Sequence, residues 1–488
     1  MPTLGHVGAQ SYSFRKFDFK GALDRLADLG LDTMEFCAVH FPPDPDNPGL
    51  GKILAELARR GVSVPEGAFA PVGEARGNEP VRVRFSREMA PETVEARFSI
   101  APDVPGDFAW PDAQTLVFTP QRPLPAGQTY TVTFAAGAEA QNGATLDSPA
   151  TWRFTVLPPR VVYLSPASAF RQQLVQADPA TGAEEPLTTT EQGVRDYAVS
   201  PNGRAVAYSQ ENEDGTANLW VLDLLTGARW PITDCVEAVC DAPAWRPDGR
   251  QIAYQRAELD PARGTGTGPA RAWIVDLATL APRRLFEDEQ ALGVRPVWSP
   301  DGTRVAAFDA SIPGIRVTDL RGGADVLIES LEGAAGIFAP DSGRLLIPVL
   351  VRGALGEAFY TQLELVDLAQ GERTRVSGAV DAPVEDTGAV WLPDGDALIV
   401  LRRYLDDRFT PGRQIYRLAL ATGEAEPLVV DAGYTHSALA LDAAGTRLVY
   451  QRFPVNQPDA EPEIWTLDLM TGERALVAED AFLPDWVP

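Results

Sequence analysis

The sequence predicts a mainly β protein: a β-sandwich followed by a seven-bladed β-propeller, with a truncated βαβα segment in front of both. Three observations support this fold class. From about residue 66, apolar and polar residues alternate in short runs between turn residues, which is typical of β-strands. From residue 160, a turn followed by two strands recurs roughly every 40–50 residues, which indicates propeller blades. Residues 1–66 instead show helical spacing of apolar residues.

Residues 1–66 are expected to alternate between strands and helices, beginning with a strand over "HVGAQSYSF" and a helix over "FKGALDRLADLG". The stretches "QSYSFRKFDF", "LADLGLDTMEF" and "LAELARRGVSV" resemble the start of the xylose-isomerase-like sugar phosphate isomerase/epimerase family of TIM barrels. That resemblance implies chemistry at the carboxyl ends of strands, where Glu35 and His40 lie. Because a complete barrel takes about 250 residues, we interpret the segment as a chimeric remnant without a catalytic site.

Residues 67–157 are expected to form the sandwich, with strands at "VRVRFS", "TLVFTP", "TYTVTF" and "TWRFTV". The stretches "PVRVRFSREM", "TLVFTPQRPLPAGQTYTVTF" and "TWRFTV" resemble the bacterial Ig-like domain of S-layer and other cell-surface proteins. The resemblance implies a spacer or an adhesive module rather than a catalytic unit.

Residues 158–488 are expected to form the propeller. Its repeated turns are "SPNG", "RPDG", "SPDG", "APDSG", "LPDG" and the degraded "DAAG", in which Pro presets the turn and Gly takes positive φ. Residues 160–189 supply three strands without an inner strand, and residues 482–488 supply an inner strand without the rest of a blade. Pairing these two pieces completes a seventh blade and removes two free sheet edges. The alternative is a six-bladed or open arrangement, which leaves the pieces unpaired.

A tryptophan recurs four residues before the turn glycine in several repeats. We interpret these side chains as packing between neighbouring blades rather than as a ligand-stacking cage, because they recur at one blade position. The tryptophans concerned are Trp245, Trp298, Trp391 and, in the last inner strand, Trp486.

The repeats resemble the TolB-like, WD-repeat-like bacterial propellers, through the turn and the two strands that follow it. That resemblance implies an interaction platform. Some propellers of this type precede a serine hydrolase domain, but the sequence contains no G-x-S-x-G elbow.

The composition and the few reactive side chains narrow the possible partners. The formal net charge of −26 argues against nucleic acid as a partner. Cysteines and histidines are too scattered for a zinc site, and no cofactor is predicted. Cys235 and Cys240 are close enough to form a disulfide in an oxidising compartment and are free thiols in a reducing one.

These features predict a non-enzymatic binding protein of the cell envelope or exterior, with a protein, peptide or glycan at the propeller face. The alternatives are a sugar phosphate isomerase/epimerase, and a propeller that binds a glycan or peptide in its channel. The sequence shows no recognisable signal peptide and no apolar stretch of the roughly 18 residues that a membrane helix needs, so the cytoplasm remains an alternative location.

Overall fold

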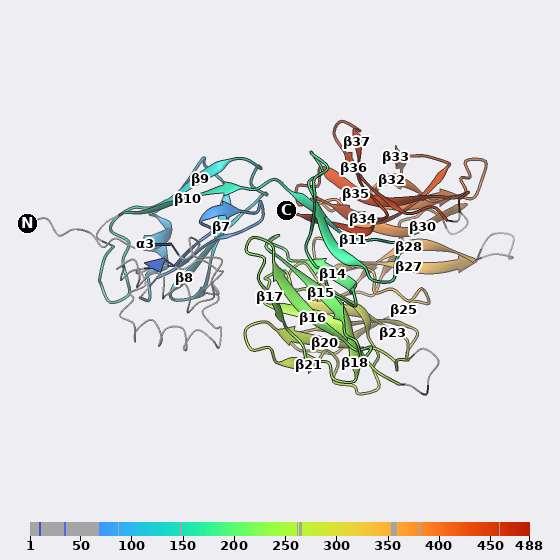
Figure 1. Ribbon diagram of the computed structural model, residues 1–488, viewed down its shortest axis with the longest axis horizontal. Helices are drawn as coiled ribbons and strands as arrows, with labels where there is room; N and C mark the ends of the chain where they lie inside the picture. The colour runs from blue at the N-terminus through green and yellow to red at the C-terminus, as the bar shows by residue number, and fades with distance from the viewer. Residues whose placement is uncertain are drawn as a thin grey trace, which may run out of the picture. The chain divides into compact units, whose positions relative to one another are not determined.

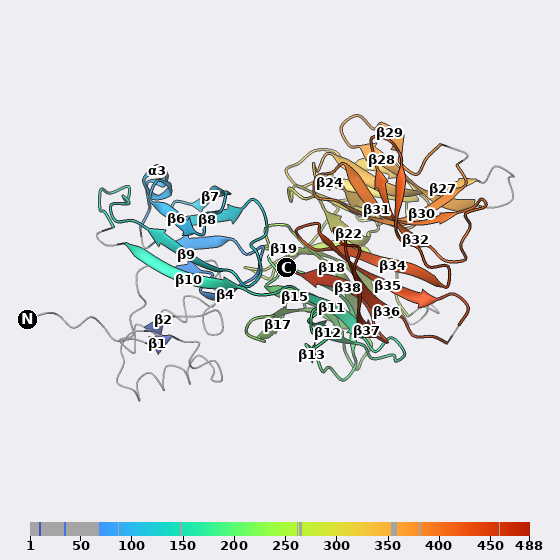
Figure 2. The same cartoon turned by 90° about the horizontal axis from the view of Figure 1, so that it is seen from above.

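The structure is a computed structural model that describes residues 9–10, 34–35 and 68–488, except 86, 147–148, 261, 263–265, 353–358, 380–381 and 458. The described chain is almost entirely β, which confirms the predicted fold class. It divides into two compact units: Met1–Pro158 with Asp223–Ala228, and Pro159–Leu222 with Arg229–Pro488. Figure 1 and Figure 2 label most of their strands, and each unit is described by itself.

The first 67 residues contribute two short described strands. β1 (Ala9–Gln10) pairs in parallel with β2 (Met34–Glu35), at the positions of the first two predicted strands. The remainder of the expected βαβα segment, including His40 and the side chain of Glu35, lies outside the described residues. The resemblance to sugar isomerase barrels falls on that part of the chain.

The remaining strands of the first unit form a β-sandwich of two four-stranded sheets, in the orders β4-β10-β9-β6 and β3-β5-β8-β7. Buried side chains from both sheets pack into one core that includes Leu116, Phe134 and Phe154. One helix, α3 (Pro91–Glu95), was not expected, and it begins with Pro at its first turn. The strands are β3 (Ala68–Ala70), β4 (Gly73–Ala75), β5 (Val81–Arg84), β6 (Phe98–Ala101), β7 (Gly106–Asp112), β8 (Thr115–Pro120), β9 (Thr129–Phe134) and β10 (Ala150–Val156).

The alternating sequence pattern explains which side of a sandwich strand is buried. In β9 the tyrosine, valine and phenylalanine side chains are buried, while the threonines between them remain accessible. On the outer face, two threonines of β9 each form a hydrogen bond with a threonine of β10. Thr129 Oγ1 lies 2.8 Å from Thr155 Oγ1, and Thr133 Oγ1 lies 3.1 Å from Thr151 Oγ1. Successive side chains of a strand point to opposite faces, so this pattern fixes the register.

The second unit is a seven-bladed propeller with four antiparallel strands in each blade. Blade 1 contains β14 (Val194–Val199), β15 (Ala205–Glu211), β16 (Ala217–Asp223) and β17 (Arg229–Pro231); blade 2 contains β18 (Ala238–Trp245), β19 (Gln251–Glu258), β20 (Arg271–Asp276) and β21 (Pro282–Arg284). Blade 3 contains β22 (Val294–Trp298), β23 (Arg304–Asp309), β24 (Gly314–Asp319) and β25 (Val326–Glu329); blade 4 contains β26 (Ile337–Phe338), β27 (Arg344–Arg352), β28 (Phe359–Asp367) and β29 (Arg373–Arg375). Blade 5 contains β30 (Val384–Trp391), β31 (Ala397–Tyr404), β32 (Gln414–Ala419) and β33 (Ala425–Val429); blade 6 contains β34 (Tyr434–Leu441), β35 (Arg447–Pro454), β36 (Glu463–Asp468) and β37 (Arg474–Glu479).

Blade 7 is built from both ends of the propeller region. It contains β38 (Phe482–Val487), β11 (Arg160–Ser165), β12 (Gln173–Ala177) and β13 (Glu184–Pro186), and Figure 2 shows red β38 beside green β11. The pairing is antiparallel and places Trp486 opposite Val161. Additional bonds join the same two segments, with the Ser168 hydroxyl donating to Asp480 Oδ2 at 2.7 Å. The ring therefore closes within a sheet rather than by loop contacts.

The repeated turns have the chemistry that their sequences predict. In blade 3, the Ser299 hydroxyl donates to Asp301 Oδ1, which also accepts the backbone N–H of Thr303 at 3.0 Å, and Gly302 has a φ of 67°. In blade 4 the turn has an extra residue, and Ser342 takes the positive φ instead, at 60°. Among the described residues, α3 is the one helix, and its five residues are too few to cross a membrane.

Candidate functional site at the inner strands

The inner strand of each blade, which is the first of its four strands, carries an irregularity. The ladder between the inner strand and its neighbour shifts register in six blades, all except blade 4, where β26 has only two residues. Four non-glycine residues on these strands have positive φ: Ala242 at 51°, Arg295 at 46°, Ala438 at 48° and Leu483 at 52°. Such bulges redirect side chains, and this left-handed backbone costs about 1–3 kcal/mol per non-glycine residue.

Four charged residues on inner strands form what we call the axial cluster: Arg195 and Asp196 on β14, Asp241 on β18, and Arg295 on β22. Arg195 Nε lies 3.4 Å from Asp241 Oδ2, and Arg295 Nη1 lies 3.3 Å from Asp196 Oδ2. Asp196 on β14 belongs to blade 1 and Arg295 on β22 belongs to blade 3. Their ion pair therefore extends across the inner strand of blade 2. Inner strands surround the axis of a propeller, so this pair lies at the axis.

Accessibility differs between the two kinds of charge in the axial cluster. The side chains of Arg195 and Arg295 are 41% and 66% exposed, whereas those of Asp196 and Asp241 are only 13% and 15% exposed. Burial raises the pKa of Asp196, and the neighbouring Asp241 raises it further, although Arg295 and Arg195 act in the opposite direction. The cluster therefore presents guanidinium groups to a ligand over a layer of partly covered carboxylates.

Two polar residues lie where blade 7 meets blade 1. The Tyr197 hydroxyl is 2.7 Å from the carbonyl oxygen of Val162 and 2.5 Å from that of Leu483. Burial raises the pKa of Asp485 to about 6, and the one hydrogen bond of its side chain comes from the backbone N–H of Trp486. Burial also raises the pKa of Tyr197, and the charge of Asp485 raises it further.

Blade 5 contains a buried ion pair between its inner strand, β30, and the neighbouring strand, β31. Arg402 Nε and Nη2 lie 2.8 and 2.7 Å from the two carboxylate oxygens of Asp386, and Nη2 also donates to the Ser377 carbonyl at 3.3 Å. The Asp386 side chain is fully buried and that of Arg402 is 5% exposed. Burial alone lowers the pKa of Arg402, but the hydrogen bonds and charge of Asp386 outweigh it and raise the pKa overall.

His436 is the one histidine of the propeller and lies on inner strand β34. Its ring is buried, with Nδ1 2.8 Å from the Arg413 carbonyl oxygen, and burial lowers its pKa to about 4. A histidine held neutral on a backbone carbonyl is not placed to exchange a proton with a serine nucleophile. Across residues 68–488, with the gaps given above, no group of three Asp, Glu, His or Cys side chains is placed to hold a metal ion.

The four predicted blade tryptophans all lie in hydrophobic clusters that join neighbouring blades. Two of them also bond across the blade interface: Trp245 Nε1 donates to the Ala198 carbonyl at 2.9 Å, and Trp298 Nε1 donates to the Ala244 carbonyl at 3.0 Å. Trp391 and Trp486 pack at the same blade position, but their indole N–H groups find no acceptor.

Replacing Trp298 with phenylalanine is expected to destabilise the protein more than replacing Trp391 with phenylalanine. Both changes remove the same ring atoms, but only Trp298→Phe takes a donor away from a carbonyl, the part-buried one of Ala244, which costs about 1 kcal/mol. Urea unfolding of the two variants measures the difference. Equal losses of stability would show that the interblade hydrogen bond contributes nothing.

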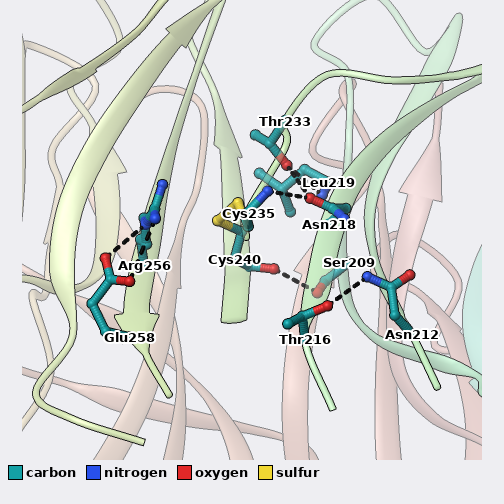
Figure 3. Close-up of a disulfide and its surroundings, with 10 residues drawn as sticks. All are labelled: Ser209, Asn212, Thr216, Asn218, Leu219, Thr233, Cys235, Cys240, Arg256 and Glu258. Atoms are coloured by element: carbon teal, nitrogen blue, oxygen red, sulfur yellow. Dashed lines mark hydrogen bonds and ion pairs between the residues drawn. A yellow bond between two sulfur atoms is a disulfide. The ribbon is translucent and has the colours of Figure 1, made fainter. Parts of the chain in front are cut away.

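Cys235 and Cys240 are joined by a disulfide, shown in Figure 3, which ties the start of β18 to the loop before it. Polar contacts hold both halves: the Cys235 backbone N–H donates to Asn218 Oδ1, and the Ser209 hydroxyl donates to the Cys240 carbonyl, each at 2.7 Å. Both cysteines are buried, so the disulfide is part of the packing of blade 2 rather than an exposed redox group.

The axial cluster was not predicted from the sequence, although the sequence holds one signal for the bulges near it. Pro243, Pro296 and Pro484 each stand two residues before the blade tryptophan, and the residue before each proline has positive φ. The recurring proline therefore marks the bulge. Which side chains meet at the axis depends on pairing between non-adjacent blades, for which the sequence has no local pattern.

Comparisons with known proteins found a domain family within the chain and a curated relative that is named a peptidase. Residues 68–156 match the family model of the bacterial Ig-like domain. The chain is 26% identical over 211 residues to the "Uncharacterized peptidase YuxL" of Bacillus subtilis (strain 168), and the match covers 42% of the chain and 29% of that protein. The chain thus spans less than a third of the length of this curated relative.

Solved structures with similar folds have low sequence identity to the chain. The puromycin-hydrolyzing peptidase of Mycobacterium tuberculosis is 16% identical with a TM-score of 0.49, covering 84% of the chain and 57% of that structure. TolB from Acinetobacter baumannii is 14% identical with a TM-score of 0.41, covering 80% and 83%. The β-propeller domain of the Trilobed protease from Pyrococcus furiosus is 14% identical with a TM-score of 0.44, covering 72% and 93%.

The peptidase relative corrects the predicted function. The prediction of a non-enzymatic binding protein is wrong, because the curated protein that the chain matches is named a peptidase. That match gives no support to the sugar phosphate isomerase/epimerase alternative either. The absence of a catalytic motif did not justify the prediction, because a propeller fold is compatible with many functions and does not by itself exclude an enzyme.

Proposed function

We propose that this protein takes part in peptide hydrolysis, as an enzyme of the peptidase type. The observation that carries the proposal is the 26% identity over 211 residues to a protein named a peptidase. Peptide hydrolysis by a serine enzyme needs a nucleophile and a base within hydrogen-bond reach of each other. His436, the one histidine among residues 68–488, is buried against a backbone carbonyl, so we do not assign it the role of that base.

The axial cluster suits the binding of peptides in this scheme. A peptide offers carbonyl oxygens and carboxylates as acceptors, and the exposed guanidinium groups of Arg195 and Arg295 are strong donors for both. Their ion pairs with Asp241 and Asp196 hold them in place before a ligand arrives, which lowers the entropy lost on binding. We therefore propose that the propeller selects and orients the peptide.

A cleavage assay tests both parts of the proposal. The full-length chain is mixed with a library of internally quenched peptides, and new termini are identified by mass spectrometry. We expect cleavage, which slows about fivefold or more in the Arg195→Gln/Arg295→Gln variant. Arg321→Gln is the matched control, because the Arg321–Asp319 ion pair is exposed and lies on another part of blade 3. No cleavage of any peptide contradicts the hydrolytic function, and equal rates in the cluster variant contradict its role in selection.

We further propose that the protein works in the cell envelope or outside the cell. The match to the bacterial Ig-like domain and the Cys235–Cys240 disulfide support this location, since disulfides persist in oxidising compartments.

Protein taken from its native cell is therefore expected to resist thiol alkylation at Cys235 and Cys240 until it is reduced. The sample is denatured in the alkylating reagent and analysed by mass spectrometry before and after reduction. Cys37 serves as the internal control, because it has no partner cysteine left and should be alkylated without reduction. Alkylation of all three cysteines before reduction would place the protein in a reducing compartment.

A further inference from the structure

A groove of about 620 Å³ runs along blade 5, whereas the axial cluster belongs to blades 1, 2 and 3. Its lining includes Val384 at the start of β30, Arg402 and Tyr404 at the end of β31, and Arg408 in the loop that follows. The turn before β33 contributes Glu424, and β33 itself contributes Glu426. The groove thus joins residues from three strands and two connections of blade 5, and from the segment that leads from β29 to β30.

The charges of the groove are separated along the strands. Arg402 pairs with Gln414 at the start of β32, whereas Glu426 pairs with Arg417 and Ala425 pairs with Leu418 toward its end. Three to four residues of β32 therefore separate the arginine level from the glutamate level, which is about 10–13 Å at 3.3 Å per residue. An extended peptide of about four residues covers the same distance.

The two ends also differ in how their charges are balanced. Arg402 is paired with buried Asp386, and Arg408 pairs with Asp406 and stacks on Tyr404, 3.7 Å from the ring centroid. Glu424 and Glu426 are exposed, and their side chains form no hydrogen bond or ion pair with other described residues. The arginine end is therefore close to neutral, while the glutamate end keeps one net negative charge when Arg417, which stands opposite Glu426 in the ladder, is counted.

We propose that this groove binds an extended peptide segment with a basic side chain at the Glu424 and Glu426 end. A lysine or arginine side chain there supplies the missing positive charge, and Arg408 keeps Nη1 free to donate to a peptide carbonyl at the other end. The net charge of −26 favours the approach of basic segments over acidic ones. The inference rests on the proposed role in peptide hydrolysis, for which the groove is a second contact that selects basic substrates.

Calorimetric titration with capped peptides tests the proposal without requiring cleavage. The probe is an acetylated and amidated tetrapeptide of three alanines and one lysine, compared at low ionic strength with the same peptide carrying norleucine or glutamate instead. We expect the lysine peptide to bind at least about fivefold more tightly than the norleucine peptide, and the glutamate peptide to bind most weakly. Equal affinity for the three peptides would overturn the proposal.

A matched pair of variants locates the binding. Glu424→Gln/Glu426→Gln is expected to remove the preference for lysine and to weaken binding of the lysine peptide about fivefold. Glu473→Gln is the control, because Thr471-Gly472-Glu473 repeats the Thr422-Gly423-Glu424 turn in blade 6 and lies outside the groove. If the groove variant binds like the unmodified protein, or if Glu473→Gln has the same effect, the groove is not the site. Because binding is measured directly, lysine-selective binding without cleavage would overturn the hydrolytic function and leave the groove assignment intact.

Discussion

Asp386→Ala is expected to lower the free energy of unfolding by about 3–5 kcal/mol, the largest effect of any single substitution considered for this protein. Removing the carboxylate leaves the guanidinium of Arg402 buried, with the Ser377 carbonyl and the Tyr404 hydroxyl as its remaining partners. A buried charge without its partner keeps the desolvation cost and loses the attraction that offsets it. Chemical unfolding followed by tryptophan fluorescence measures the loss.

Two further variants separate the buried pair from a general effect of removing an aspartate. Asp406→Ala breaks a similar bidentate pair with Arg408 in the same blade, but that pair is exposed, so stability should change little. The double variant Asp386→Leu/Arg402→Met replaces the pair with apolar side chains and is expected to regain most of the stability. A double variant no more stable than Asp386→Ala would mean that packing, rather than unpaired charge, causes the loss.

Asp485→Asn is expected to stabilise the protein at neutral pH by up to about 3 kcal/mol, which corresponds to a pKa raised from 3.8 to about 6. The native state binds the proton of Asp485 more tightly than the unfolded state does. The native state is therefore most favoured below pH 3.8, loses stability as pH rises from 3.8 to 6, and stays at the lower level above pH 6. The side chain keeps some contact with solvent, which makes 3 kcal/mol an upper bound.

Unfolding curves between pH 3.5 and 7.5 test this expectation. The stability difference between Asp485→Asn and the unmodified protein should be small at the acidic end and should grow until about pH 6. Asparagine keeps the oxygen that accepts the Trp486 N–H, so the variant changes the charge and little else. Asp407→Asn, at an exposed position, is the control and should show no such rise. A constant difference across the pH range would show that Asp485 titrates normally.

The parts of the fold that follow from local patterns could be predicted from the sequence. The strand over residues 129–134 and the turn at Ser299–Gly302 each need only their own side chains to define them, through alternation and through turn chemistry. The pairing of residues 482–488 with the start of the propeller is long-range, yet counting inner and outer strands was enough to predict it.

The site could not be predicted in the same way, because its residues acquire their properties from distant neighbours. Arg402 ends a predicted strand, "ALIVLR", where a charged side chain would normally reach solvent. In the fold it is buried, because it pairs with Asp386 on the neighbouring strand β30. Asp196 and Arg295 come from blades 1 and 3, which are not consecutive in the sequence, so no rule of residue spacing predicts their contact. His436 is neutral because of the carbonyl and the apolar surroundings that it meets after folding.

The composite seventh blade has a consequence for biosynthesis. On the ribosome, β11 is made first among the propeller strands, yet its inner partner β38 is made last among them. Until then one edge of β11 has no ladder partner and can accept a strand from another nascent chain. Pairing over such a long separation in sequence is also slow, since the ends of a long loop must first meet. The ring is therefore most vulnerable to misassembly during synthesis, and it becomes resistant only in the last step of folding.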